Sequence, residues 1–401
     1  MNYLPRRLEP SLHHALKRGK SVLLLGPRQT GKTTMINRIE ADLSISLLEP
    51  GARRRYEAEP DLLSGEVEAL TSKNKQASSL VVLDEIQRVP VLLDAIQHLI
   101  DGKKARFILT GSSARKLRRR SNVNLLPGRL VSLRLDPFVL SEAQDLQRPI
   151  EDHLLEGDLP LLFDVESPQD RETDLRSYVN AYLEEEVRAE ALVRNLGPFS
   201  RFLELAASES GNQINARKLS MDIGVAQNTI ASYYQILEDC LIIERIHPLT
   251  QSHSRKKLAK TDKFLFFDLG VRRLAAGESR RQTPERMGAL FEQFVGLQLL
   301  RCARLSPEAC QLRYWRDGNG PEVDWVLEQD GRYTPIEAKW TDTPRTKDIR
   351  HLRLFLSEYP QAEQAYVICR VPRKTKLDKN IFAIPWQDCN NLVHDMLRGK
   401  E

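Results

Sequence analysis

A segment near the N-terminus has the residue types needed to bind a nucleoside triphosphate. It consists of Gly26, Pro27, Arg28, Gln29, Thr30, Gly31, Lys32 and Thr33, fits the pattern G-x-x-x-x-G-K-[ST], and continues into Thr34. Glycines let the backbone wrap closely around phosphates and point its N–H groups inward, where a helix N-terminus adds to the attraction for anions. Lys32 would place a compact charge at the β- and γ-phosphates, and the Thr33 hydroxyl would ligate Mg²⁺. The segment therefore predicts a phosphate-binding loop for ATP with Mg²⁺.

Two adjacent acids follow a later apolar run. Residues 80–83 are Leu-Val-Val-Leu, and Asp84 and Glu85 come directly after them. This order predicts a buried strand with Asp84 at its exposed C-terminal end, where the carboxylate would hold magnesium, usually through water. Glu85 would then polarise the attacking water, which indicates hydrolysis as well as binding. The alternative is that the two acids only cap the end of a strand.

Three further residues are candidates for sensing or stabilising the γ-phosphate. Residues 107–110 predict a third strand, and Thr110 or Ser112 at its end would hydrogen-bond to that phosphate; the alternative is a polar loop after a strand. Arg129 is a candidate arginine finger, acting on its own site or on a neighbouring copy's site. Such an arginine is worth about 10³–10⁵ in rate. The alternative for Arg129 is an ordinary surface cation.

The C-terminal region contains charged residues inside strand-like segments. Side chains alternate between the two faces of a strand, so Glu322 and Asp324 share one face of their segment, and Glu337 and Lys339 share one face of theirs. Carboxylates gathered in this way are costly unless a cation lies among them. Their oxygens suit a second Mg²⁺ or Mn²⁺, and a lysine beside them would orient a metal-bound water. The alternative is a hairpin turning at Gly331, with a solvated face and cross-strand ion pairs.

The spacing of apolar residues predicts the elements that position these groups. Short apolar strands alternate with helical patterns up to about Leu140, which indicates an α/β fold with a parallel sheet. Helices are expected at 8–18, 32–39, 91–100, 175–193 and 288–303, and strands at 21–25, 80–83, 107–110, 241–246, 312–315, 323–327, 333–338 and 365–369. Residues 277–284 are polar and basic, and are expected to form a linker.

The middle of the chain predicts a helix-turn-helix. A helix with Leu219 and Ile223 ends at Gly224, and a second helix runs from Gln227 to Leu237. A following strand and the basic residues 255–257 would form a wing. If the unit binds DNA, base contacts would come from the second helix, at Gln227, Asn228, Thr229 and Ser232. The alternative is a packing or protein-contact module.

These motifs together resemble a known family. The segments GPRQTGKTT, LVVLDEIQ, FILTGSS, LPGR, LDPFVLSEA, GDLPLLF, YVNAYLEEEV and KLAKTDKFLFFDLG resemble the AAA-type ATPases of bacteria and archaea that carry a C-terminal domain of uncharacterised function. The resemblance implies an AAA-type P-loop ATPase core (1–150), a helical connector (151–197), a winged helix-turn-helix region (198–275) and a restriction-endonuclease-like domain (285–395). It also implies that Asp324 and Glu337 ligate a metal, that Lys339 assists the nucleophile, and that Glu292 is an accessory acid.

Composition sets weaker bounds. The 401 residues include 60 basic and 55 acidic side chains, giving a net charge of +5, which permits DNA contact without arguing for it. The five cysteines form no C-x-x-C pair, so neither a disulfide framework nor a zinc site is expected. No apolar run reaches the ~18 residues of a membrane span, and the N-terminus lacks the pattern of a signal peptide. The expected location is the cytoplasm, without membrane partners.

Two functions from different classes fit these predictions. The favoured one is a Mg²⁺-dependent ATPase that switches a nucleic-acid-associated, nuclease-like C-terminal domain. The alternative is a non-cleaving ATP-dependent regulator that acts through protein or DNA contacts of the winged helix. The sequence is compatible with assembly into a homo-oligomer. A helicase is a weaker third option, because no helicase-like run of motifs follows Thr110.

Overall fold

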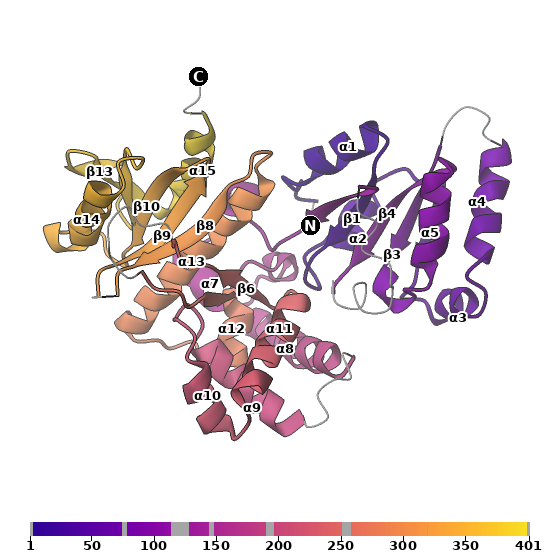
Figure 1. Ribbon diagram of the computed structural model, residues 1–401. Helices are drawn as coiled ribbons and strands as arrows, with labels where there is room; N and C mark the ends of the chain where they lie inside the picture. Colours follow the sequence, from indigo (N-terminus) through magenta and orange to yellow (C-terminus); the bar gives the residue numbers. More distant parts are fainter. Residues whose placement is uncertain are drawn as a thin grey trace. The chain divides into compact units, whose positions relative to one another are not determined.

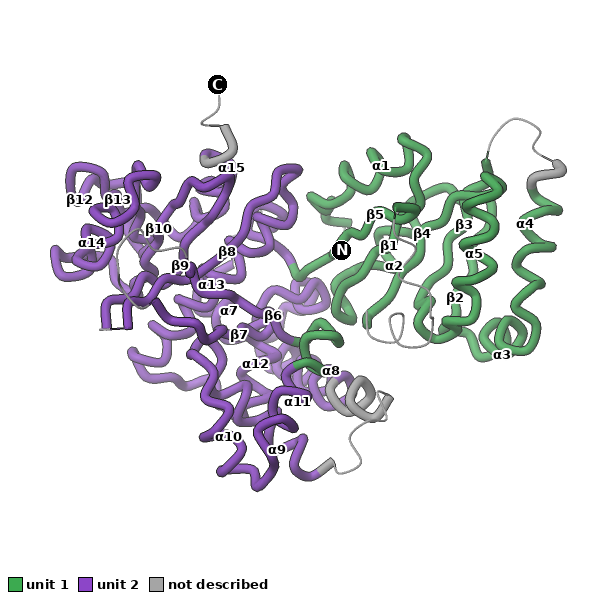
Figure 2. Tube along the Cα trace, in the orientation of Figure 1, with its two compact units in different colours: residues 1–137, 184–192, 235–242 green, residues 138–183, 193–234, 243–401 purple. Residues whose placement is uncertain are grey.

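A computed structural model of the chain describes residues 3–73, 78–113, 128–143, 148–189, 196–250, 258–318 and 320–398 (Figure 1). Its contacts divide it into two compact units (Figure 2). The first unit comprises residues 1–137, 184–192 and 235–242, and the second comprises residues 138–183, 193–234 and 243–401. The phosphate-loop motif therefore belongs to the first unit, and the acidic C-terminal motif belongs to the second.

A five-stranded parallel sheet forms the first unit, with the strand order β2-β3-β4-β1-β5. Its strands are β1 (Ser21–Leu25), β2 (Leu43–Ser46), β3 (Ser79–Asp84), β4 (Ala105–Gly111) and β5 (Leu130–Arg134). Strand β4 pairs with both β1 and β3, and all these pairings are parallel. The C-terminal ends of β1, β4 and β3 therefore lie side by side at one edge of the sheet.

Helices cover this sheet, as the alternating pattern predicts. They are α1 (Glu9–Lys17), α2 (Lys32–Ile36), α3 (Pro50–Ala58), α4 (Leu62–Lys73) and α5 (Leu92–Asp101). Leu92, Ile96 and Leu99 of α5 are fully buried and share a core with Val81 and Phe107 of the sheet. The prediction of an α/β fold with a parallel-sheet core is confirmed. The edge strands β2 and β5 were not predicted, because their alternating or partial burial leaves no continuous apolar run.

Between Ile150 and Ala275 the chain is mainly helical. The helices are α7 (Ile150–Glu156), α8 (Pro168–Ala189), α9 (Leu196–Ser208), α10 (Ala216–Ile223), α11 (Gln227–Asp239) and α12 (Leu269–Ala275). Asn215 caps α10 by accepting a hydrogen bond from the Lys218 N–H, and Gly224 ends α10 in the left-handed conformation. Both helices of the predicted helix-turn-helix are thus present. An antiparallel pair, β6 (Ile243–Ile246) and β7 (Lys263–Phe266), follows it, whereas the predicted basic wing at 255–257 lies outside the described residues.

A six-stranded mixed sheet forms the C-terminal part of the second unit, with the order β12-β13-β11-β10-β9-β8. Its strands are β8 (Gln311–Arg316), β9 (Glu322–Gln329), β10 (Arg332–Ala338), β11 (Ala365–Cys369), β12 (Thr375–Asp378) and β13 (Ile381–Pro385). The accompanying helices are α13 (Pro284–Leu305), α14 (Arg350–Glu358) and α15 (Cys389–Arg398). Strands β8, β9 and β10 are antiparallel neighbours, so Asp324 and Glu337 lie on adjacent strands, as predicted.

The middle and C-terminal parts of the second unit share one hydrophobic core. Leu154 of α7 and Leu265 of β7 belong to the same buried cluster as Phe294 of α13 and Leu327 of β9. Both predicted regions, 198–275 and 285–395, fall largely within this unit, and their separation as domains stays a prediction.

The segment expected to be a linker is held in place by ion pairs. Glu278 pairs with Arg272 of α12 and Arg286 of α13, and Arg280 pairs with the buried Glu156 at 2.5 Å. Residues 277–283 form neither helix nor strand and connect α12 to α13, in agreement with the linker prediction, and their charged residues bind neighbouring charges. Within the described ranges, no helix is both long and apolar enough to cross a bilayer.

Candidate functional site

The phosphate-binding motif forms the turn between β1 and α2. Gly31 has φ +93°, a conformation that side chains with a Cβ rarely adopt, and it immediately precedes Lys32, the first residue of α2. A Cβ at Gly26 would lie 2.3 Å from the Leu135 carbonyl oxygen, so only glycine fits there. The Lys32 ammonium donates hydrogen bonds to the Gly26 and Pro27 carbonyls, each at 2.8 Å. The loop thus surrounds the Lys32 ammonium, which is the group expected to bind the phosphates.

Thr33 and Asp84 meet across the end of the sheet, although they are far apart in sequence. The Thr33 hydroxyl donates to Oδ2 of Asp84 at 3.1 Å. Asp84 is 4% exposed and also accepts a hydrogen bond from the Thr110 hydroxyl. A hydroxyl and a carboxylate are hard oxygen donors that suit Mg²⁺. The two residues predicted to bind the ATP-associated magnesium are therefore adjacent.

Glu85 is fixed by its backbone and by three partners. Its φ of +61° is unusual for a residue other than glycine and marks local strain. Its N–H donates to the Thr110 hydroxyl at 2.9 Å, and its carboxylate accepts from the Gln87 side-chain amide and from the Ser112 hydroxyl. Thr110 and Ser112, predicted as γ-phosphate sensors, contact the two acids in the structure. Gln87 was not singled out from the sequence, although it stands two residues after Glu85.

Arg129 does not lie near the phosphate loop of its own chain. It directly precedes β5, and Leu130 at the start of β5 pairs with Ser21 at the start of β1. The phosphate loop follows the opposite end of β1, about 17 Å away for five residues at ~3.3 Å each. Arg129 instead pairs with the exposed Asp101 at 2.6 Å. Of the two alternatives for an arginine finger, action on its own site is wrong, because the polarity of the parallel strands puts Arg129 at the other edge of the sheet. Action on a neighbouring copy's site stays a prediction.

Arg6 supports the phosphate loop and was not predicted. Its guanidinium donates to the Thr30 carbonyl at 2.6 Å and to the Asp136 carbonyl at 2.7 Å, and the residue is 6% exposed. One side chain from the N-terminal segment thus joins the loop to the segment that follows β5. A single arginine before a helix gives no local sequence signal for such a role.

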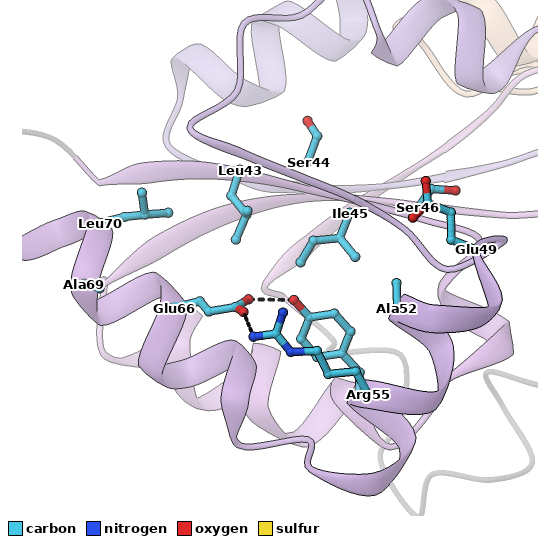
Figure 3. Close-up of a pocket in the computed structure, with 11 residues that line it drawn as sticks. Leu43, Ser44, Ile45, Ser46, Glu49, Ala52, Arg55, Glu66, Ala69 and Leu70 are labelled. Atoms are coloured by element: carbon cyan, nitrogen blue, oxygen red, sulfur yellow. Dashed lines mark hydrogen bonds and ion pairs between the residues drawn. The ribbon is translucent and has the colours of Figure 1, made fainter.

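A hollow of about 520 Å³ lies elsewhere in the first unit, at the edge strand β2 (Figure 3). Its walls come from β2, α3 and α4, and within it Glu66 accepts hydrogen bonds from Arg55 at 2.5 Å and from the Tyr56 hydroxyl at 2.6 Å. None of its lining residues belongs to the phosphate loop or to the two acids. The nucleotide site is therefore identified by its phosphate- and metal-binding groups.

The predicted C-terminal residues also come together. The Lys339 ammonium lies between two carboxylates, at 3.2 Å from Asp324 and in hydrogen-bond contact with Glu337. Asp324 also accepts from the Ala338 N–H at 2.9 Å. Asp324 is 9% exposed and Glu337 is 3% exposed, so this is no solvated strand face. One Glu337 oxygen, Oε1, is buried without a hydrogen-bond partner in the described structure.

A second lysine, absent from the predictions, completes this cluster. Lys263 of β7 is 3% exposed and lies 2.6 Å from Glu322 and 3.5 Å from Glu292. Its ammonium also lies over the rings of Tyr314 and Trp325. We name the four carboxylates and two ammonium groups the acidic cluster: Glu292, Glu322, Asp324, Glu337, Lys263 and Lys339.

The pKa values of the acidic cluster follow from burial and mutual charge. Burial, with the neighbouring Asp324, raises the pKa of Glu337 well above its ordinary value, and burial raises the pKa of Glu292 to about 7. Burial acts to raise the pKa of Asp324, but the Lys339 ammonium, the hydrogen bond from the Ala338 N–H and the Lys263 ammonium together outweigh burial and lower that pKa. Perturbed carboxyl groups of this kind occur in functional sites and in structural ion-pair networks.

The predicted metal arrangement at Asp324, Glu337 and Glu292 is not formed. Among the residues described, no group of three or more His, Cys, Asp or Glu side chains is arranged to hold a metal ion. The reason is visible in the contacts, since the Lys339 ammonium lies where a cation shared by Asp324 and Glu337 would bind. The donor set is chemically suitable for Mg²⁺, and the unpartnered Oε1 of Glu337 is the one feature that favours a cation there.

The fold and the first site define the N-terminal part of the chain as a P-loop nucleoside triphosphatase fold. In agreement, the sequence matches a family described as AAA domain at residues 18–144. Two further matches, each described as a domain of unknown function, are DUF8612 at residues 147–282 and DUF4143 at residues 287–389. The first match supports an AAA-type ATPase domain with ATP as its nucleotide.

Two mycobacterial proteins resemble most of the chain. It is 28% identical to the uncharacterized proteins Rv2008c of Mycobacterium tuberculosis and Mb2031c of Mycobacterium bovis, over 384 residues that cover 93% of this chain and 82% of each relative. A solved signal transduction ATPase with numerous domains, PH0952 from Pyrococcus horikoshii, is similar over 76% of this chain and 47% of its own length, with 13% identity and a TM-score of 0.28. So low a TM-score gives no information about the function of this chain.

Proposed function

We propose that the chain is a Mg²⁺-dependent ATPase whose nucleotide state controls the second unit. The observation that carries this proposal is the 3.1 Å contact between Thr33 and Asp84, with Glu85 held by Gln87 and Ser112 beside it. This arrangement provides both the binding half and the hydrolytic half of a phosphoryl-transfer site.

In this proposal each residue has one role. The loop amides and the Lys32 ammonium neutralise the phosphates, with Lys32 leaving its contacts to the Gly26 and Pro27 carbonyls. Thr33 and Asp84 would hold the magnesium ion, which when bound offsets charge on the β- and γ-phosphates. The Glu85 carboxylate orients a water molecule and accepts its proton. The Thr110 hydroxyl holds the Asp84 side chain and the Glu85 backbone in place by hydrogen-bonding to both of them.

The test separates nucleotide binding from hydrolysis. Lys32→Ala is expected to lose ATP binding, whereas Glu85→Gln is expected to bind ATP with Mg²⁺ and to turn it over at least about 100-fold more slowly. Arg28→Ala is a matched control, because Arg28 lies in the same loop at a position that the motif leaves variable. Equal turnover by wild type and Glu85→Gln would overturn the proposed role of Glu85. Binding of ATP by Lys32→Ala with wild-type affinity would overturn the site itself.

A second candidate function is that the second unit binds and cleaves nucleic acid. Gln227, Asn228 and Ser232 are exposed at the start of α11, as a DNA-contacting helix requires, and Glu337 keeps one buried oxygen, Oε1, without a hydrogen-bond partner in the described structure. Cleavage of DNA with Mg²⁺ or Mn²⁺ should disappear in Asp324→Asn while ATP turnover stays unchanged. Binding without cleavage, lost in Asn228→Ala, would instead support a non-cleaving regulator.

A further inference from the structure

A cavity of about 190 Å³ lies inside the second unit, beside the helix-turn-helix. Its walls come from the end of α9, the loop at residues 209–215, helices α10 and α11, and strand β7. The volume is below the ~300–1,000 Å³ of pockets for drug-sized ligands, so the cavity suits a smaller molecule. No residue of the acidic cluster lines it.

Opposite charges stand at the rim of this cavity. The Glu209 carboxylate and the Lys218 ammonium are 3.1 Å apart, and their side chains are 42% and 57% exposed. Asn212 donates its side-chain amide to Glu209 at 3.2 Å. An ion pair at this exposure contributes little to stability, about 0–1 kcal/mol, so a ligand that carries both charges can replace it at small cost.

The Tyr234 side chain adds a hydroxyl group to this cavity. Tyr234 of α11 is 6% exposed as a residue and lines the cavity, and within the described ranges no hydrogen bond involves its hydroxyl. Burial, assisted by the nearby Glu209, raises the pKa of Tyr234, so the hydroxyl stays protonated. The hydroxyl oxygen itself is accessible to solvent, so a polar group of a ligand can hydrogen-bond to it in place of water.

Part of the remaining wall is apolar, whereas Ser210, Asn212, Gln213 and Asn215 contribute polar side chains. The Tyr234 ring stacks on the Phe264 ring with centroids 4.6 Å apart, and Leu219 is buried at 4% exposure. These groups would enclose a short apolar side chain. The cavity thus offers a carboxylate, an ammonium, a hydroxyl and an apolar wall within the space of one small molecule.

We propose that this cavity is a binding site for a small zwitterion of the size of a free α-amino acid. The ligand ammonium pairs with Glu209, the ligand carboxylate pairs with Lys218, and a polar group of the ligand hydrogen-bonds to the Tyr234 hydroxyl. Its side chain lies against Leu219 and Phe264.

Three contacts connect this cavity with the acidic cluster in the same unit. Ser210 donates to the side chain of Gln293, which follows Glu292, at 2.8 Å. Gln213 donates to the Tyr314 hydroxyl at 2.9 Å, and the Tyr314 ring lies under Lys263. Phe264 in the cavity wall directly follows Lys263 in β7. A ligand that orders these walls would therefore also stabilise the position of Lys263, which makes the cavity an effector site for the second unit.

The experiment is calorimetric titration of the full chain with each of the twenty standard amino acids. At least one is expected to bind saturably, and ethanolamine or propionate, which carry one charge each, are expected to bind at least about 10-fold more weakly. Tyr234→Phe removes one hydrogen bond and should weaken binding about 5-fold. Tyr233→Phe is the matched control, because Tyr233 packs on Phe199 and does not line the cavity.

Two outcomes would overturn the proposal. One is that no amino acid binds to a chain that still binds ATP. The other is that Tyr234→Phe and the rim variants Lys218→Met and Glu209→Gln all bind the amino acid as tightly as wild type does. Lys218→Met keeps the test decisive even if Tyr234→Phe fails to fold, since Lys218 is largely exposed.

Discussion

The Thr110 hydroxyl donates a hydrogen bond to the Asp84 carboxylate from the neighbouring strand. The same oxygen accepts the Glu85 N–H at 2.9 Å, so one buried side chain fixes both acids of the nucleotide site. This contact depends on the strand order, because β4 lies between the strand of the phosphate loop and the strand of the acids.

Replacing Thr110 by valine should slow ATP turnover more than it weakens ATP binding. Valine keeps the shape of threonine but leaves Oδ1 of Asp84 without the Thr110 donor and the Glu85 N–H without its acceptor, while the Thr33 hydroxyl still donates to Oδ2 of Asp84. We expect turnover to fall about 10- to 100-fold, with ATP affinity changing less than about 3-fold. Steady-state ATP turnover and equilibrium binding of ATP, each measured for Thr110→Val and wild type, check this prediction. Thr110→Ser should stay near wild type, and a Thr110→Val enzyme with normal turnover would show that the hydroxyl only packs.

The local chemistry of the nucleotide site was predictable from the sequence. Lys32, Thr33, Asp84 and Glu85 each lie beside an apolar strand, and their chemistry is specific enough to identify their roles. The polarity of parallel strands could also have corrected the prediction for Arg129. A residue just before a strand lies at the sheet edge opposite the carboxyl ends where the acids stand.

The supporting residues were not predictable, because their partners are remote in sequence. Lys263 forms an ion pair with Glu322, which is 59 residues later in the sequence. Arg6 donates a hydrogen bond to the carbonyl of Asp136, which is 130 residues later. Neither residue lies in a local pattern. The position of Lys339 was not predictable for a related reason, since alternation places side chains on a face without saying that Lys339 lies between the Asp324 and Glu337 carboxylates.

The stability of the second unit should depend on pH through Asp268. Burial, with the nearby Asp158, raises the pKa of Asp268 from 3.8 to about 6. Between pH 4 and pH 6 the unfolded chain has then lost a proton that the folded chain retains, so the free energy of unfolding falls as pH rises. A shift of this size corresponds to about 3 kcal/mol.

Asp268→Asn should remove that pH dependence. The amide keeps only one acceptor for the Val271 and Asp158 N–H groups, so stability at pH 4 should fall by about 1–3 kcal/mol. The difference from wild type should shrink toward pH 6, because the slope of the variant between pH 4 and pH 6 is flatter. Denaturant unfolding followed by tryptophan fluorescence measures the free energy of unfolding at each pH. All four tryptophans, Trp315, Trp325, Trp340 and Trp386, lie in the second unit. An unchanged slope would show that Asp268 is ionised throughout this range.

Replacing Lys339 by methionine tests whether the acidic cluster accepts a cation. Removing the ammonium leaves Asp324 and Glu337 facing each other, which should lower the free energy of unfolding by about 3–5 kcal/mol. If the carboxylates take a divalent ion in its place, Mn²⁺ should stabilise Lys339→Met more than wild type. Lys376→Met, at an exposed position of β12, is the control. Lack of recovery with Mn²⁺ would mean that the cluster is a structural ion-pair network.

Arg6 should determine how well the phosphate loop is organised before ATP arrives. Its guanidinium bridges the Thr30 and Asp136 carbonyls at 2.6 and 2.7 Å, and a planar fork with several donors suits that geometry better than an ammonium does. Arg6→Met removes both bonds and leaves two carbonyls without these donors. Each bond is worth about 1 kcal/mol, and part of that loss should appear as weaker binding of ATP, by about 10-fold.

Titration with a fluorescent ATP analogue measures the Arg6 effect, with Arg7→Met as the control because Arg7 is its exposed neighbour. Arg6→Lys should be intermediate, since one ammonium reaches both carbonyls less well than a forked guanidinium. If Arg6→Met is destabilised but binds the analogue with wild-type affinity, then the bridge holds the fold together without organising the loop. A loss of affinity without a loss of stability would instead show that the bridge acts on the nucleotide site alone.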